Sequence, residues 1–132
     1  MENDEEKRME DIIRQDGRYP PEAYGFLHEG LSYAIQKTHG DEAGKAGQQK
    51  HVTGKQLCLG LRDLAVERWG LLAKAVLERW NIRATIDFGN MVYLLVDSKF
   101  MRKTEEDSLE DFRDVYDFQT AFDLADDFEL KE

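Results

Sequence analysis

The spacing of apolar residues along most of this chain is typical of α-helices. Met9, Ile12 and Ile13 recur at intervals of three and four residues, which predicts a first helix over residues 5–15. A second stripe of the same period predicts a helix from residue 22 to about residue 37, opened by the two prolines before it. Residues 38–50 contain almost nothing apolar, so we expect a loop there.

The middle of the chain predicts two further helices. Thr53 and Gln56 fit a capping box, so a helix is expected to begin there, run to about residue 68 and end at Gly70. Residues 71–80 continue the helical period up to a turn at Asn81. The residues expected to be buried on this fourth helix are Leu72, Ala73, Val76, Leu77 and Trp80.

The last predicted helices begin at polar caps. Thr85 with Asp87 predicts the start of a helix that reaches about residue 100, where Lys99, Arg102 and Lys103 favour a helix C-terminus. Ser108 and Asp111 predict one more helix over residues 109–116. From residue 117 to 128 the pattern weakens, and helical, extended and disordered states remain open.

Together these elements predict a mostly α fold, a compact bundle of about five to six helices with an acidic C-terminal segment. A winged-helix-like core is one form that such a bundle can take. The chain has 132 residues, which suits a single domain, and we place that domain at residues 1–118. Residues 119–132 are expected to form an acidic, partly ordered tail.

Charge is divided unevenly along the chain. Residues 1–104 contain 16 acidic and 16 basic side chains, whereas residues 105–132 contain 12 acidic and two basic ones, the whole net charge of −10. Within the first part, residues 50–104 carry ten Lys and Arg against five Asp and Glu. The simplest interpretation is that the acidic segment packs beside the basic one.

Other features of the composition indicate a cytoplasmic protein with no membrane association. No apolar run approaches the roughly 20 residues that cross a bilayer. Residues 1–11 are highly charged, unlike a secretory signal. The single cysteine, Cys58, excludes a disulfide within the chain and fits a reducing compartment.

Several short motifs follow one another in a fixed order. They are Arg18-Tyr19 with Ala23-Tyr24, His51-Val52-Thr53-Gly54, Asp87-Phe88-Gly89 and Asp114-Val115-Tyr116-Asp117-Phe118. Over roughly residues 18–122 the chain therefore resembles a small bacterial protein family with no established function. Where that family has Trp-Gly, this chain has Trp80-Asn81, and both Gly and Asn tolerate the left-handed turn. The resemblance implies one structural unit and no activity, cofactor or catalytic residue.

Cys58 and the three histidines have catalytic or metal-binding interpretations, and each competes with a structural one. Cys58 lies one turn into a predicted helix, where a thiol pKa is lowered, and His51 is the base it would need. Its neighbours Leu57 and Leu59 favour a buried thiol instead, so an enzyme of unknown reaction remains only an alternative. His28, His39 and His51 lack the spacing of helical metal ligands. We assign no catalytic residue, metal site or cofactor.

A helix-turn-helix over residues 71–100 is the second alternative, because Lys74, Arg79 and Arg83 lie around its turn. The net charge of −10 opposes it, since DNA affinity comes largely from neutralising phosphates. Nucleic acid is therefore an unfavoured partner.

The acidic C-terminal segment carries the favoured functional hypothesis. Its aromatic rings can anchor in apolar pockets while its carboxylates attract a basic surface. We expect a small interaction or regulatory domain that binds a basic protein through Phe118, Phe122, Asp123, Asp126, Asp127 and Phe128. The rings of Phe112 to Phe118 have a competing structural interpretation, in which they close the domain's own core. Composition assigns no oligomeric state.

Overall fold

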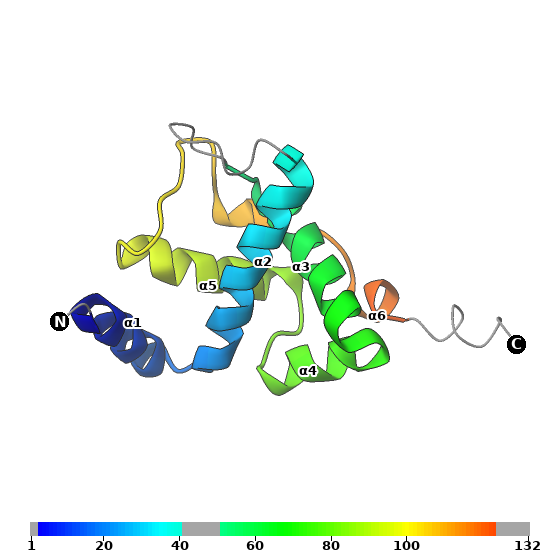
Figure 1. Cartoon of the computed structure of the whole chain (residues 1–132), viewed down its shortest axis with the longest axis horizontal. Helices are drawn as coiled ribbons and strands as arrows, with labels where there is room; N and C mark the ends of the chain where they lie inside the picture. Colours follow the sequence, from blue (N-terminus) through cyan, green and yellow to red (C-terminus); the bar gives the residue numbers. More distant parts are fainter. Residues whose placement is uncertain (1–2, 41–50, 124–132) are drawn as a thin grey trace, which may run out of the picture.

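The computed structural model describes residues 3–40 and 51–123 and shows the predicted mostly helical fold (Figure 1). The α-helices are α1 (Asn3–Asp16), α2 (Pro21–His39), α3 (Gly54–Trp69), α4 (Ala73–Arg79), α5 (Thr85–Asp97) and α6 (Phe118–Ala121). Two short 3-10 turns, η2 (Gly70–Leu72) and η3 (Leu109–Phe112), complete the described elements. No strand occurs in these residues, so they contain no β-wing.

The first half of the chain follows its predicted local signals. Gly17 adopts a φ of 76° and ends α1, and Pro21 is the first residue of α2. The Thr53 hydroxyl accepts from the Gln56 N–H (3.0 Å) and the Gln56 side chain accepts from the Thr53 N–H (2.9 Å), which confirms the capping box. Thr38 and His39 belong to α2, so the predicted loop begins later; residues 41–50 lie outside the described part.

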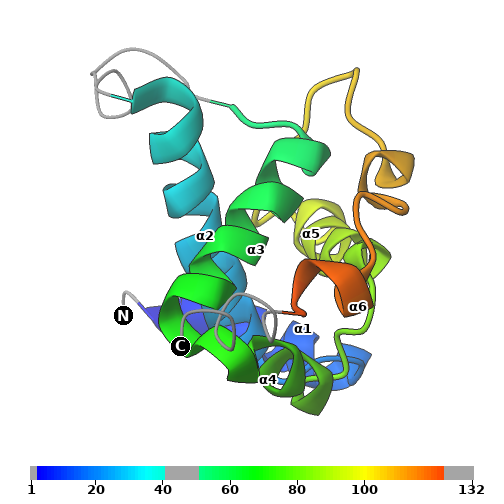
Figure 2. The same cartoon turned by 90° about the vertical axis from the view of Figure 1, so that its right-hand side faces the viewer.

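Helices α2 and α3 pack closely because a glycine lies at each of two close contacts. A Cβ added at Gly30 would lie 2.0 Å from Leu61 Cδ2, and one at Gly60 would lie 2.7 Å from the Cβ of Ala34. Neither position has space for a larger side chain. Figure 2 shows α2 and α3 side by side, with α3 the nearer of the two to α5.

The fourth predicted helix is shorter than its sequence pattern. Residues 70–72 form η2 and α4 begins only at Ala73, because Gly70 has a positive φ of 54° that interrupts the helix. Leu72, predicted to be buried, is 65% exposed, whereas Ala73 and Leu77 are fully buried. Val76 and Trp80 are half-buried.

Helix α5 differs from its prediction at both ends. Its start is capped by Asp87, which accepts from the Arg83 and Ala84 N–H groups (2.8 and 3.0 Å), and not by Thr85. It ends at Asp97, before the three basic residues expected to finish it. Lys99 has a φ of 70°, and the Phe100 N–H turns back to donate to the Leu95 carbonyl (2.8 Å).

The predicted helix over residues 109–116 is also wrong in extent. Only η3 forms there, and Asp114 has a φ of 53°, which no α-helix contains. The packed chain continues through α6 to Phe122, beyond the boundary expected after residue 118.

Candidate functional site

The C-terminal segment, residues 105–123, is attached to the domain by its aromatic rings. Phe118 and Phe122 are 5% and 4% exposed, and their rings lie edge to face with centroids 5.1 Å apart. Phe118 also meets Phe88 of α5, with ring centroids 6.2 Å apart. Two rings expected to bind a partner are therefore in the chain's own core in this structure. Asp123 is exposed, and Asp126, Asp127 and Phe128 lie outside the described residues.

Hydrogen bonds hold the same segment in register. The fully buried Thr85 hydroxyl donates to the Phe112 carbonyl (2.6 Å) and accepts from the Val115 N–H (3.1 Å). The Tyr116 hydroxyl donates to the Cys58 carbonyl (2.8 Å). The motifs at residues 87–89 and 114–118 therefore contribute to one interface, which we call the closed side. This segment packs beside α3 and α5 mainly through rings and backbone groups.

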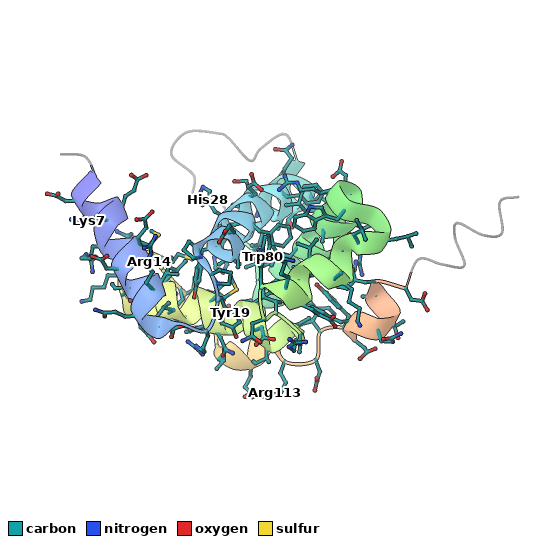
Figure 3. All side chains as sticks on the ribbon, turned by 90° about the horizontal axis from the view of Figure 1, so that it is seen from below. Lys7, Arg14, Tyr19, His28, Trp80 and Arg113 are labelled. Atoms are coloured by element: carbon teal, nitrogen blue, oxygen red, sulfur yellow. The ribbon has the colours of Figure 1, made fainter. Side chains whose placement is uncertain are left out.

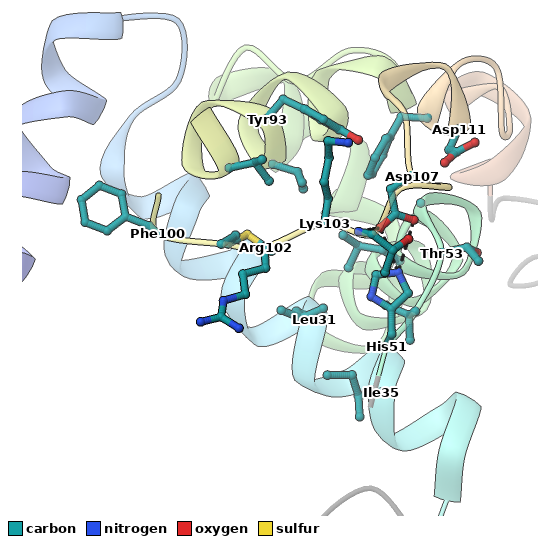
Figure 4. A pocket seen from close by; sticks show the side chains of 18 of the residues that line it. Leu31, Ile35, His51, Thr53, Tyr93, Phe100, Arg102, Lys103, Asp107 and Asp111 are labelled. Atoms are coloured by element: carbon teal, nitrogen blue, oxygen red, sulfur yellow. Dashed lines mark hydrogen bonds and ion pairs between the residues drawn. The ribbon is translucent and has the colours of Figure 1, made fainter. Parts of the chain in front are cut away.

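A groove opens beside the second half of α5. It encloses about 780 Å³ between α2, the start of α3, α5 and residues 99–104. Leu31 and Ile35 line it from α2 (Figure 4), and Val96 of α5 and Phe100 line it as well. These side chains are half-buried, so apolar surface remains exposed along the groove.

Residues 99–104, which we call the basic strap, form one rim of this groove. Lys99, Arg102 and Lys103 line it and are exposed, and none of the ion pairs in the described part of the chain involves them. Asp107 and Asp111 also line the groove, but each carboxylate accepts from a backbone N–H of its own turn, those of Thr104 and Ser108. Glu105 and Glu106 line an adjoining hollow.

His51 and Asp107 tie the strap to the start of α3. Their side chains are 3.1 Å apart, from Nε2 to Oδ2, and the His39 ring donates to the His51 carbonyl (2.8 Å). Burial acts to raise the pKa of Asp107, but hydrogen bonds from the Thr104 N–H and from His51 outweigh it and hold the pKa below its ordinary value. The hydrogen-bonded pair of His51 and Asp107 thus forms a clamp at one end of the groove (Figure 4).

Cys58 does not have the surroundings of a nucleophile. Its side chain is fully buried in the core, and burial raises the pKa of the thiol to about 12. The group therefore stays protonated at neutral pH, and the hypothesis that pairs Cys58 with His51 for catalysis finds no support. The described residues also contain no cluster of three or more His, Cys, Asp or Glu side chains suited to a metal ion.

The helix-turn-helix alternative is not supported either. The helix that would enter the major groove, α5, carries Asp87 and Asp97 and no basic residue. Arg79 and Arg83 are exposed near the turn, but two cations beside an acidic helix are a weak phosphate-binding set.

In the part of the chain that the structure describes, no helix combines the length and apolar character needed to cross a membrane.

Another polar network is structural. The Tyr19 hydroxyl donates to Asp87 (2.6 Å) and accepts from the Asn90 amide (3.1 Å). Burial, followed by the bond to Asp87, raises the pKa of Tyr19 to about 12. Tyr19 lies near the middle of the molecule seen from below in Figure 3, where it joins the α1–α2 link to α5. This contact explains why motifs 68 residues apart in sequence belong to one unit.

Comparison of the chain with protein-family models, curated proteins and solved structures gave no match. The resemblance in its motifs remains a prediction.

Sequence reasoning missed the groove although it noticed the residues that form it. The sequence pattern indicated a helix end at Lys99, Arg102 and Lys103, where basic side chains interact favourably with the helix dipole. The one available signal was that Ser98-Lys99 interrupts an apolar run that resumes at Phe100-Met101, which is typical of a chain reversal.

Proposed function

We propose that this protein is a noncovalent binding domain whose groove receives a short segment of a partner protein that is both apolar and acidic. The observation that carries the proposal is the combination, in one groove, of apolar walls with three exposed cations that have no ion-pair partner within residues 3–40 and 51–123. Burial of large side chains against the walls supplies affinity, and the cations attract and orient carboxylates. An amphipathic segment with both features complements the groove.

The distribution of charge favours an extended ligand over a small molecule. Small-molecule sites use a few polar groups that converge on one ligand. Here the cations follow one another along the basic strap, and the side chains of Arg102 and Lys103 point in different directions (Figure 4). A chain with several carboxylates can meet both, whereas one small anion meets only one.

Binding of a labelled model peptide, measured by fluorescence anisotropy, tests this function. The peptide alternates Leu or Phe with Asp or Glu, and its twin carries Lys in place of each acid. We expect the acidic peptide to bind and the Arg102→Glu/Lys103→Glu protein to bind it about tenfold more weakly, from the sum of a few exposed ion pairs. The matched control is Arg79→Glu/Arg83→Glu, which makes the same charge change on exposed cations outside the groove.

A second pair of variants tests the apolar wall. Ile35→Glu places a charge in the groove and should abolish binding, whereas Leu72→Glu alters an exposed leucine that does not line it. Equal loss in Ile35→Glu and Leu72→Glu, or equal binding of the Lys-substituted peptide, would contradict the proposal.

A second candidate function rests on the outer face of the C-terminal segment. Its three phenylalanine rings are buried, while the acidic residues Glu110, Asp114 and Asp117 are exposed, as is Arg113. We propose that this face, together with residues beyond Asp123, engages a basic protein surface. Asp114→Lys/Asp117→Lys should remove such a partner from a pulldown without weakening the peptide bound in the groove. Retention of the partner would eliminate this candidate.

A further inference from the structure

We infer that the groove's ligand is residues 124–132 of a second copy of this chain, an assignment that rests on the proposed binding function. The sequence of this segment, which we call the terminal segment, combines the two properties that the groove requires. Leu124, Phe128 and Leu130 are large and apolar, and acidic residues alternate with them. These acidic residues are Asp126, Asp127, Glu129 and Glu132.

The charges of the two surfaces match in number and are opposite in sign. The terminal segment has four acidic side chains and one basic one, Lys131, a formal net charge of −3. The basic strap offers Lys99, Arg102 and Lys103, which have no ion-pair partner among the described residues. Complementary charge of this kind guides encounter and selects the register of docking.

The place where the described chain ends favours a second copy over the same copy. Phe122 is buried beside Phe118, which contacts Phe88 in the first half of α5, so α6 is fixed at that end of the helix. The groove lies beside the second half of α5, at Val92 and Val96. Figure 1 shows α6 near the start of α5, whereas the basic strap leaves the opposite end of that helix. A neighbouring copy can present its groove directly, whereas within one copy the terminal segment would have to run back along α5.

If the terminal segment docks in this way, the groove of each chain is normally occupied by a second copy. If each of two copies offers its terminal segment to the other, the contact closes on itself as a symmetric dimer. A foreign acidic peptide then competes with the terminal segment. Self-association is expected to weaken as salt is raised, because exposed charges are screened.

Charge exchange between two full-length variants tests the inference by sedimentation velocity. Arg102→Glu/Lys103→Glu gives a groove that repels the native segment, and Asp126→Lys/Asp127→Lys gives a segment that the native groove repels. We expect each variant alone to be monomeric at concentrations where the native chain associates. A mixture of the two should associate again, because each segment then meets a groove of opposite sign.

Two controls distinguish loss of docking from a general effect of charge or a loss of folding. Arg79→Glu/Arg83→Glu should self-associate as the native chain does, and circular dichroism should show unchanged melting for every variant. A labelled peptide of residues 123–132 should bind the full chain and lose about tenfold in affinity when Arg102 and Lys103 are reversed.

Three other outcomes would contradict the inference, and one of them would contradict the proposed function as well. If the native chain is monomeric while unrelated acidic peptides still bind the groove, the inference is wrong and the proposed function stands. If the mixture of variants stays monomeric, the segment and the groove are not partners. If no acidic peptide binds at all, the inference and the proposed function both fail.

Discussion

The two halves of α5 face different surroundings. In the first half, Gly89 lies so close to η3 that an added Cβ would be 2.8 Å from Phe112 Cβ, and Thr85 bonds to the Phe112 carbonyl. In the second half, Val96 faces the groove, whose other wall is formed by half-buried side chains of α2. One helix thus supports both the closed side and the groove.

The two halves of this helix therefore have different roles: the first contributes to stability and the second to binding. On the closed side, Gly89 packs against the ring of Phe112, and the Thr85 hydroxyl donates to the Phe112 carbonyl. Substitution of either residue disturbs a close fit. Along the groove, larger aliphatic residues leave space, and the three basic residues of the strap have no ion-pair partner among the described residues. Substitutions on the closed side should therefore affect folding, and those along the groove should affect association.

The largest expected effect is from Phe112→Ala. Phe112 is 4% exposed, so its removal leaves a cavity and should lower the free energy of unfolding by about 4 kcal/mol. Phe100→Ala on the groove side should cost only about 1 kcal/mol, because Phe100 is half-buried. Urea denaturation of both variants measures the difference. Equal losses would show that the two sides of α5 contribute alike to stability.

Thr85→Val should have the next largest effect. Valine keeps the shape of threonine but leaves the Phe112 carbonyl and the Val115 N–H without their partner, which should cost about 2 kcal/mol. Hydrogen exchange of the Val115 amide should accelerate as well. A variant as stable as the native chain would mean that these backbone groups are satisfied in another way.

Alanine substitutions at two glycine positions should change the free energy of unfolding in opposite directions. Gly89→Ala should lower the free energy of unfolding by about 1 kcal/mol, because crowding against Phe112 and Leu109 exceeds the gain in helix propensity. Gly25→Ala in α2 meets no atom within 4 Å and should raise it by about 0.5–1 kcal/mol. Thermal denaturation measures both; a stabilised Gly89→Ala protein would show that the closed side can adjust.

The smallest expected effect concerns the clamp at the end of the groove. Asp107→Ala removes the acceptor for Thr104 and His51 and should cost about 1 kcal/mol at neutral pH. Because the pKa of Asp107 is lowered by folding, its contribution is present above the ordinary aspartate pKa of 3.8 and lost as pH falls through the folded value. Native and variant stabilities should converge in acid. A difference that persists unchanged below pH 3.8 would show that the charge of Asp107 is not involved.

Local sequence signals were sufficient wherever the structure is decided by neighbours in the chain. The capping box at Thr53 and Gln56, the end of α1 at Gly17 and the left-handed turn at Asn81 are all confirmed, since each depends on a few consecutive residues. Lengths were less predictable. Helix α5 stops at Asp97 although helix-forming residues follow, because Phe100 turns back to bond with Leu95.

The candidate site was predicted only in part. The sequence indicated an acidic, aromatic segment and a basic middle, but it did not show that Phe118 and Phe122 are covered by Phe88 and Tyr116. Burial of a ring depends on residues distant in sequence, and the same amphipathic pattern suits a core or a partner's pocket.

By itself, the sequence determined the helical class, most helix starts and the division of charge, because periodicity, capping and composition are local properties. Only the tertiary structure decided which side of α5 is closed and which is open. That outcome depends on long-range matches such as Gly89 with Phe112 and Tyr19 with Asp87, which no local pattern encodes. The tertiary structure also places Lys99, Arg102 and Lys103 beside an apolar groove, where they have no ion-pair partner among the described residues.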